Sequence, residues 1–361
     1  MELFIGHSEM IMTTPTEPST EMSSPGPLFV VGVWRSGTSL FYALLNQHPQ
    51  ITLWYESDLP LLWPLFLGRK AKRDWRERWQ FWNAAPARHG IDWSTLPQDV
   101  STLAEACEVV WKRHAGPSVY GCKSPNYFDM LPSLAKQFPN GKFIVIHRNP
   151  VDVCRSIARA SEKDSFFSKP GMVLRALLGC HELKSGVDTL VAQGVSVHQV
   201  QYETLLEDPT GVMTDVCRFL SLPFHVRMTS LQDADRSAIY DAAHHELVKS
   251  NRIGGKRERC EVLPPSLLKK INRYIAFWHR RSAGNWPAVP KSSGIQPDGW
   301  FAGERIWDSI LYRGLRMADS IIVFVYCFAP LSVLQWYRVL RGRGEPVAVR
   351  REDLVSVSAK D

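Results

Sequence analysis

Leu28-Phe-Val-Val-Gly-Val-Trp-Arg-Ser-Gly-Thr-Ser-Leu-Phe-Tyr-Ala-Leu-Leu45 is the stretch that decides the fold of this chain. Its start, Leu28 to Val33, is an apolar, β-branched run that is typical of a buried parallel strand. A loop bracketed by Gly32 and Gly37 follows, and an apolar helical pattern begins at Ser39. A strand, a glycine-bounded loop and a helix N-terminus present unpaired N–H groups, which suit a phosphate or sulfate group.

The loop has the glycine spacing of a phosphate loop that binds nucleoside triphosphates, but Thr38 stands where that motif needs lysine. Arg35 is the only cation in the loop, and Ser36 or Thr38 is expected to cap the helix. No later strand ends in an obvious aspartate that could hold magnesium. The pattern therefore favours an anion site without a metal, and a phosphate-loop nucleotide kinase or NTPase is the alternative. The expected binding residues are Arg35, Ser36, Gly37, Thr38 and Ser39.

Strand-like and helix-like segments alternate along the middle of the chain. The expected strands cover 119–122, 142–147 and 195–201, and the expected helices cover 127–137, 150–161, 173–192 and 205–220. This alternation predicts an α/β fold of three layers, with a central, mostly parallel sheet flanked by helices. Ligands of such sheets bind beyond the carboxyl ends of the strands. The polar residues expected there are Arg35, Lys123, Arg148 and Tyr202.

The loop Val-Gly-Val-Trp-Arg-Ser-Gly-Thr-Ser39, followed by a helix and Asn-Gln-His-Pro49, resembles the 5′-phosphosulfate loop of sulfotransferases. The match is closest to the tyrosylprotein sulfotransferase-like and bacterial branch, although Trp34 replaces the usual proline. Arg-Asn-Pro-Val-Asp-Val-Cys-Arg-Ser156 resembles the 3′-phosphate-binding segment, in which Arg148 and Ser156 would contact that phosphate. The resemblance implies a P-loop-like fold and transfer of a sulfuryl group from 3′-phosphoadenosine 5′-phosphosulfate (PAPS) to a hydroxyl or amine acceptor, with no metal.

The resemblance also implies roles for single residues. A glutamate at the position of Glu56 is the catalytic base of the resembled branch, and an acceptor hydroxyl needs such a base. Cytosolic small-molecule sulfotransferases instead use a histidine two residues after the strand-end lysine, where this chain has Pro125. Lys123, with Arg35, would stabilise charge in the in-line transition state. Tyr202 would contact the adenine, and a later basic loop would close over the donor through Ser250, Arg252 and Lys256.

Composition narrows the class of protein. The chain has 361 residues, 45% of them hydrophobic, and a net charge of +7. Its basic residues are spread out rather than clustered among stacking aromatic residues, so we expect no nucleic-acid partner. The cysteine count of seven is odd and no pair has Cys-x-x-Cys spacing, which favours a reducing, cytoplasmic compartment without a zinc site. Residues 1–26 lack a signal-peptide pattern and are predicted to be a disordered leader before a sulfotransferase domain at 27–295.

Residues 296–343 form an amphipathic and then apolar helical pattern, followed by an expected flexible tail at 344–361. The run 321–337 is almost continuously apolar, is flanked by arginine on both sides and contains Pro330. Its length is close to the lower limit of about 17 residues for a bilayer span. We expect monotopic or re-entrant membrane attachment through residues 300–340; a spanning anchor and a buried core helix are the alternatives. The acceptor could be a carbohydrate, a lipid or a protein tyrosine. A further alternative function for the chain is a non-catalytic, membrane-attached nucleotide-binding module.

Overall fold

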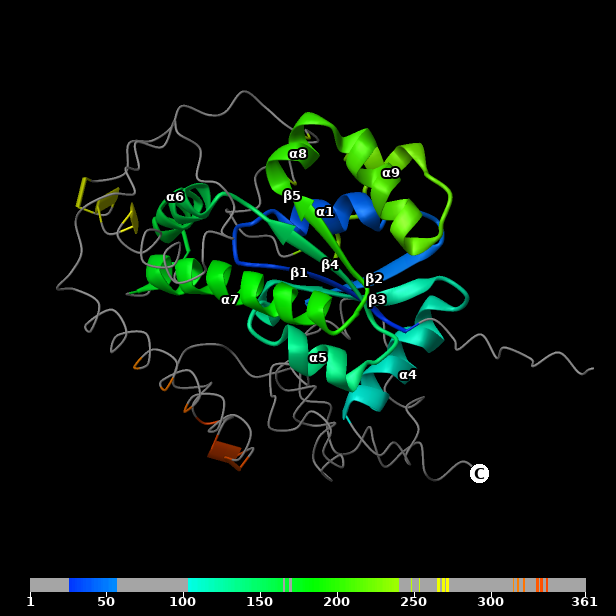
Figure 1. The fold of residues 1–361 in the computed structure, drawn as a ribbon, viewed down its shortest axis with the longest axis horizontal. Helices are drawn as coiled ribbons and strands as arrows, with labels where there is room; N and C mark the ends of the chain where they lie inside the picture. The colour runs from blue at the N-terminus through cyan, green and yellow to red at the C-terminus, as the bar shows by residue number, and fades with distance from the viewer. Residues whose placement is uncertain are drawn as a thin grey trace, which may run out of the picture.

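The computed structural model of the protein describes residues 26–56, 103–164, 166–168 and 171–239, and single residues between 248 and 336. At its centre lies a sheet in which all strand pairs are parallel (Figure 1). Within the described residues, the sheet has five strands in the order β2-β3-β1-β4-β5. The prediction of an α/β fold with a parallel central sheet is therefore confirmed. The strands are β1 (Leu28–Gly32), β2 (Ile51–Tyr55), β3 (Val119–Ser124), β4 (Lys142–His147) and β5 (Val197–Gln201).

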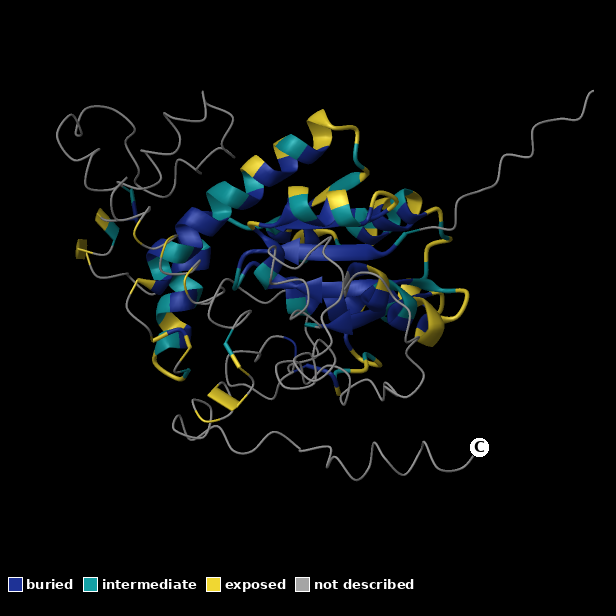
Figure 2. Ribbon diagram, turned by 90° about the horizontal axis from the view of Figure 1, so that it is seen from below, coloured by how far each residue is buried: buried dark blue, intermediate teal, exposed yellow. Residues whose placement is uncertain are grey.

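Helices cover both faces of the sheet (Figure 1). Alternation along β1 shows how: Phe29 and Val31 point into one hydrophobic cluster, whereas Leu28 and Val30 point into the other. Figure 2 shows the central strands as the most deeply buried part of the molecule. One face is covered by α1 (Thr38–Leu45), α8 (Tyr202–Glu207), α9 (Pro209–Leu220) and η3 (Val226–Thr229). The other is covered by α4 (Leu103–Ala115), η2 (Pro125–Tyr127), α5 (Leu131–Gln137), α6 (Pro150–Ser161) and α7 (Met172–Ala192).

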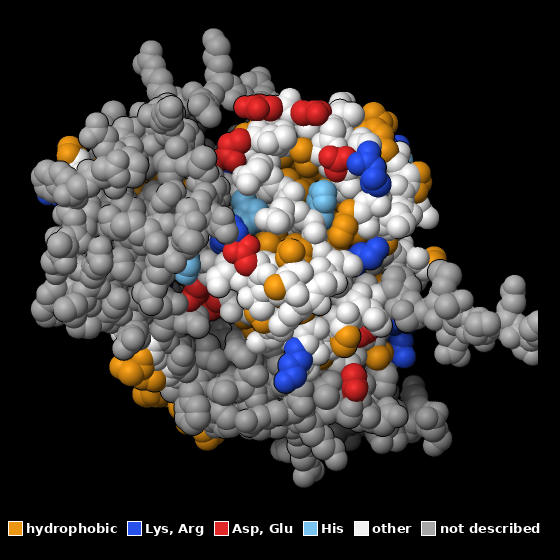
Figure 3. All heavy atoms as spheres, viewed as in Figure 1, with side chains coloured by type: hydrophobic (Ala, Val, Ile, Leu, Met, Phe, Trp, Pro, Cys, Tyr) orange, Lys and Arg blue, Asp and Glu red, His pale blue; other side chains and the backbone are white. Residues whose placement is uncertain are grey.

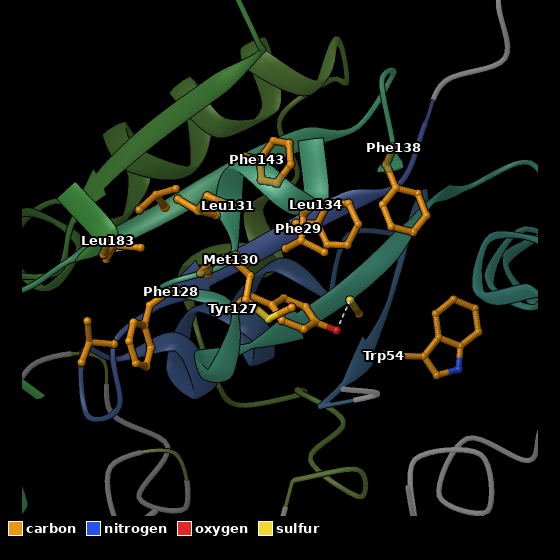
Figure 4. Close-up of a cluster of buried hydrophobic side chains, with 14 of the residues drawn as sticks. Phe29, Trp54, Tyr127, Phe128, Met130, Leu131, Leu134, Phe138, Phe143 and Leu183 are labelled. Atoms are coloured by element: carbon orange, nitrogen blue, oxygen red, sulfur yellow. Dashed lines mark hydrogen bonds between the residues drawn. The ribbon is translucent and has the colours of Figure 1, made fainter. Parts of the chain in front are cut away.

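Aromatic rings fill the cluster that contains Phe29 and Val31 (Figure 4). The ring of Phe29 lies 5.0 Å from that of Phe138 and 5.2 Å from that of Phe143, centroid to centroid. Tyr127 packs edge-on against Phe29, and its hydroxyl lies 3.5 Å from Cys122 Sγ. Such large buried rings contribute strongly to stability. These rings pack against one face of β1, β3 and β4. Polar residues follow the carboxyl ends of these strands.

Four segments differ from the sequence-based expectation. The strand β2 and the helix α4 were not predicted. The expected helix 127–137 is instead a short 3-10 turn and then α5, which has Pro132 in its first turn. The expected helix 205–220 is two helices, because Pro209 lacks the N–H that a continuous helix needs and begins α9 instead. Asp208 caps α9 by accepting a hydrogen bond from the N–H of Gly211.

Several expectations concern residues outside the described ones. These are the leader before residue 26, the tail 344–361, most of the segment 296–343, and the basic-loop residues Ser250, Arg252 and Lys256. Among the helices that the structure describes, none is both long and apolar enough to cross a bilayer. The domain boundaries therefore stay predictions.

Candidate active site

The loop between β1 and α1 forms a tight cradle. A backbone hydrogen bond from the N–H of Ser36 to the carbonyl of Val33 closes the turn, at 3.0 Å. Arg35 and Gly37 both have left-handed backbones, with φ of 67° and 97°. Gly37 takes the N-cap position of α1, and no side chain caps the helix, so the expected cap by Ser36 or Thr38 is wrong. The first-turn N–H groups of α1 are left for a ligand, as an anion site requires.

Gly37 also allows a close approach between elements. A Cβ atom at this position would lie 2.2 Å from the ring of Tyr202 at the start of α8. Tyr202 is 4% exposed, and its ring centroid lies 4.5 Å from the guanidinium carbon of Arg148. The aromatic ring thus packs between the cradle and the end of β4. Its expected contact with adenine stays a prediction.

Two arginines from different strands meet at the cradle. Arg148 Nη1 donates a 2.7 Å hydrogen bond to the carbonyl of Arg35. Arg35 Nε donates a 3.0 Å hydrogen bond to Ser156 Oγ in α6. Three residues that are distant in the sequence, and that were all predicted to bind the donor, are therefore joined by direct contacts.

The charges at this cradle favour an anion. Burial lowers the pKa of Arg35 to about 10, and Arg148 and then Arg159 act in the same direction. Ser36 Oγ and Arg148 Nε are buried without a hydrogen-bond partner among the described residues. Buried polar groups are normally paired, so these two atoms are candidates to bind an anion at the cradle. The cradle, the two guanidinium groups and the unpaired hydroxyl together fit a phosphate or sulfate group.

A second polar group lies beside the cradle, where β2 and β3 end. Lys123 is completely buried, and its Nζ donates to Glu56 Oε1 at 2.8 Å and to Ser39 Oγ at 3.2 Å. Burial alone would lower the pKa of Lys123, but the negative charge of the neighbouring Glu56 carboxylate acts against burial, and the pKa of Lys123 is raised. Lys123 therefore carries its positive charge at neutral pH. The side chain of Glu56 remains 19% exposed, so the carboxylate can be reached from solvent.

Some residues around the site were not predicted from the sequence. Asn149 Oδ1 caps α6 at the N–H of Val151, while Glu203 Oε1 accepts a 3.0 Å hydrogen bond from the N–H of Asn149. Trp34 Nε1 donates to Asn126 Oδ1 at 2.9 Å and ties the cradle to the turn after β3. All of these residues lie next to or close to a predicted residue along the chain. Adjacency was the available signal, but it does not say which neighbours point into the site.

On the face drawn in Figure 3, the described residues expose both acidic and basic side chains. The described residues hold no group of three or more histidine, cysteine or acidic residues placed to bind a metal ion. The buried charged groups of the candidate site are the arginine pair at the cradle and the Lys123–Glu56 pair beside it.

Comparison with known proteins agrees with this geometry. A family model described as "Sulfotransferase family" matches residues 27–226. A putative protein-tyrosine sulfotransferase from Caenorhabditis briggsae is 28% identical over 235 residues, which cover 61% of this chain and 70% of the relative. Protein-tyrosine sulfotransferase 1 from Danio rerio is 29% identical over 256 residues, which cover 68% of this chain and 63% of the relative. The matches thus span about two thirds of the length of these relatives.

Solved structures share the fold. The sulfotransferase domain from the curacin biosynthetic pathway superimposes with a TM-score of 0.52 at 18% identity, covering 73% of this chain and 99% of that domain. The sulfotransferase domain of the olefin synthase from Synechococcus PCC 7002 gives a TM-score of 0.53 at 19% identity, covering 73% of this chain and 96% of that domain. At this identity the likeness concerns the arrangement of strands and helices.

Proposed function

The chain belongs to the sulfotransferase family, and from this premise we propose that it transfers a sulfuryl group from PAPS to the hydroxyl of a tyrosine side chain. The observation that carries the proposal is the position of Lys123. One ammonium group contacts Ser39 of the anion cradle on one side and the carboxylate of Glu56 on the other. A donor group in the cradle and an acceptor at the carboxylate would therefore meet at this lysine.

Donor binding is assigned to the cradle and the arginine pair. The N–H groups at the start of α1 and the hydroxyl of Ser36 would hold the 5′-phosphosulfate, because no side chain caps the helix and the hydroxyl has no partner among the described residues. Arg148 and Ser156 would hold the 3′-phosphate. The guanidinium of Arg148 supplies paired donors, and the hydroxyl of Ser156 adds a directional hydrogen bond. Arg35 belongs to the cradle and also contacts Arg148 and Ser156. It would therefore neutralise negative charge between the two phosphate sites.

The chemical step requires removal of the acceptor's proton. The carboxylate of Glu56 would take the proton of the tyrosine hydroxyl as its oxygen attacks the sulfur atom. The bond between sulfur and the 5′-phosphate oxygen breaks, and its electron pair leaves with 3′-phosphoadenosine 5′-phosphate (PAP). Lys123 would donate a hydrogen bond to that oxygen while its charge increases, and Arg35 would add a second cation. A lysine has three protons to donate, so Lys123 can keep its contact with Glu56 during transfer.

The alternative of a phosphate-loop kinase or NTPase is not favoured. Thr38 occupies the position at which those enzymes carry the loop lysine. A non-catalytic binding module is not favoured either, because the chain retains a solvent-accessible carboxylate beside the cradle.

The test is transfer of labelled sulfuryl from PAPS by the full chain to a panel of acceptors. The panel contains a tyrosine peptide, its phenylalanine counterpart, a serine peptide, a sugar and a sterol. We expect label on the tyrosine peptide alone. Substitution Glu56→Gln should lower turnover by about a hundredfold or more, because the general base is lost, while PAP affinity by calorimetry stays within about threefold.

The matched control is Glu207→Gln, which changes an exposed glutamate at the end of α8. Its turnover should equal that of the unsubstituted protein. Label on the sugar or the sterol instead of the peptide would contradict the tyrosine assignment. Unchanged turnover in Glu56→Gln would remove Glu56 from the role of base, and absence of PAP binding would contradict the proposed function as a whole.

A further inference from the structure

Tyr55 is the last residue of β2 and lies at the centre of the polar group described above. In the parallel pairing of β2 with β3 it lies opposite Lys123. Neighbouring residues in a sheet point to the same face, so the two side chains meet. The ammonium of Lys123 lies 3.9 Å from the centroid of the Tyr55 ring, and the phenol oxygen lies 2.8 Å from Ser39 Oγ.

Either hydroxyl of the Ser39–Tyr55 pair can donate their hydrogen bond, and Tyr55 is the donor in the arrangement that leaves the serine proton for a ligand. Lys123 can only donate, so Ser39 Oγ accepts the hydrogen bond between them. A serine oxygen has a second lone pair, which can accept from Tyr55, and the proton of the serine hydroxyl then remains for another acceptor. In this arrangement Ser39 receives two hydrogen bonds from the protein, and its own O–H can only point away from both. Ser39 belongs to the first turn of α1, which borders the cradle, so an anion bound there can accept this proton.

We propose that Tyr55 is a positioning residue whose hydroxyl orients the hydroxyl of Ser39 toward the phosphosulfate of the donor. The inference rests on the proposed function, since it needs a donor in the cradle. Burial raises the pKa of Tyr55, so the phenol keeps its proton throughout the pH range in which enzymes work. A hydrogen bond aimed before the reaction at the oxygen where charge develops stabilises the transition state.

Packing is the competing explanation. The Tyr55 ring is fully buried, and its centroid lies 5.1 Å from that of the Tyr42 ring, edge-on. Burial of the apolar ring could alone explain why a tyrosine occupies this position. Phenylalanine fills the same space. Substitution Tyr55→Phe therefore removes only the hydroxyl, and Tyr42→Phe is the matched control. The Tyr42 hydroxyl contacts Asn46 Nδ2 at 3.4 Å, on the side of α1 that serves the core.

The experiment is a double-mutant cycle in the full chain with Tyr55→Phe and Ser39→Ala. The readouts are kcat/KM for PAPS, PAP affinity by calorimetry and the melting temperature. Tyr55→Phe should lower kcat/KM by about tenfold, the effect of one well-placed hydrogen bond. In the Ser39→Ala background the same substitution should change kcat/KM by less than about twofold, because Tyr55 acts through Ser39. Tyr42→Phe should leave kcat/KM unchanged.

The outcomes separate this inference from the proposed function. If Tyr55→Phe matches Tyr42→Phe in kcat/KM, the tyrosine only packs and the inference is wrong. The inference is equally wrong if the effects of Tyr55→Phe and Ser39→Ala multiply in the double variant. If the unsubstituted protein neither binds PAP nor transfers label, the proposed function fails, and this is seen before any variant is compared.

Discussion

Arg35 combines two features that are unfavourable in the folded chain without a ligand. Its backbone is left-handed at φ 67°, which costs a non-glycine residue about 1 kcal/mol. Its side chain is cationic, and burial beside Arg148 lowers its pKa to about 10. Strain and desolvated charge of this kind persist where surrounding contacts impose them, and they concentrate at functional sites. An anion bound in the cradle would reduce the repulsion between Arg35 and Arg148. We therefore expect Arg35 to contribute to anion binding rather than to the stability of the fold.

Substitution Arg35→Ala should therefore separate binding from folding. We expect PAP affinity to fall by about a hundredfold or more, because a buried guanidinium–phosphate contact is lost. The melting temperature without ligand should change by only a few degrees, and the rise in melting temperature that PAP causes should disappear. Arg218→Ala, at an exposed arginine of α9 that pairs with Asp215, is the control. Unchanged PAP affinity in Arg35→Ala would contradict the assignment of the cradle.

The sequence was sufficient to predict most of the site at this scale. Arg35, Lys123 and Arg148 follow or end recognisable strands, and parallel strands bring such ends together. The contact from Ser39 to Tyr55 was not predictable in the same way. It depends on the register of β2 against β3, and β2 was not identified from the sequence.

At the scale of elements, the site depends on how closely α1 and α8 approach each other. Tyr202 packs against Gly37, so the start of one helix is in contact with the N-cap of the other. The sequence indicated a glycine for the loop but not this contact, because α8 was expected as part of a longer helix. The break at Pro209 lets Tyr202 begin its own short helix directly after β5. Long-range packing of this kind is not encoded in a local pattern.

Gly37→Ala tests the contact, and the chain offers a matched control. Gly171 is also an N-cap glycine with a left-handed backbone, at φ 83°, but a Cβ atom there would meet nothing within 4 Å. Both substitutions should lose about 1 kcal/mol of stability from backbone strain. Only Gly37→Ala should also displace Tyr202 and weaken PAP binding, by about tenfold or more. Calorimetry and thermal melting measure the two effects, and equal PAP affinities in the two variants would show that the Gly37–Tyr202 contact has no role in binding.

At the scale of the whole molecule, the C-terminal segment remains to be explained. Its described residues include four exposed large hydrophobic side chains: Met317 at 64%, Ile321 at 56%, Val333 at 49% and Trp336 at 64%. Arginine flanks it in the sequence at 313, 316, 338, 341 and 343. We propose that this segment lies on an anionic lipid surface, since apolar side chains between basic ones are typical of interfacial attachment.

The full chain should therefore co-sediment with vesicles that contain anionic lipid, and more weakly with neutral ones. Changing Met317, Ile321 and Trp336 together to glutamate should lower the partition coefficient by about a hundredfold, because each side chain buried in lipid contributes about 1 kcal/mol or more. The control changes three hydrophobic residues outside this segment to glutamate. They are Phe224, Val226 and Val191, whose exposed fractions are 38%, 70% and 55%. Sulfuryl transfer to a dissolved tyrosine peptide should be equal in both triple variants. Vesicle binding that is absent in the full chain, or lost equally in the two variants, would show that the exposed side chains do not form a lipid-binding surface.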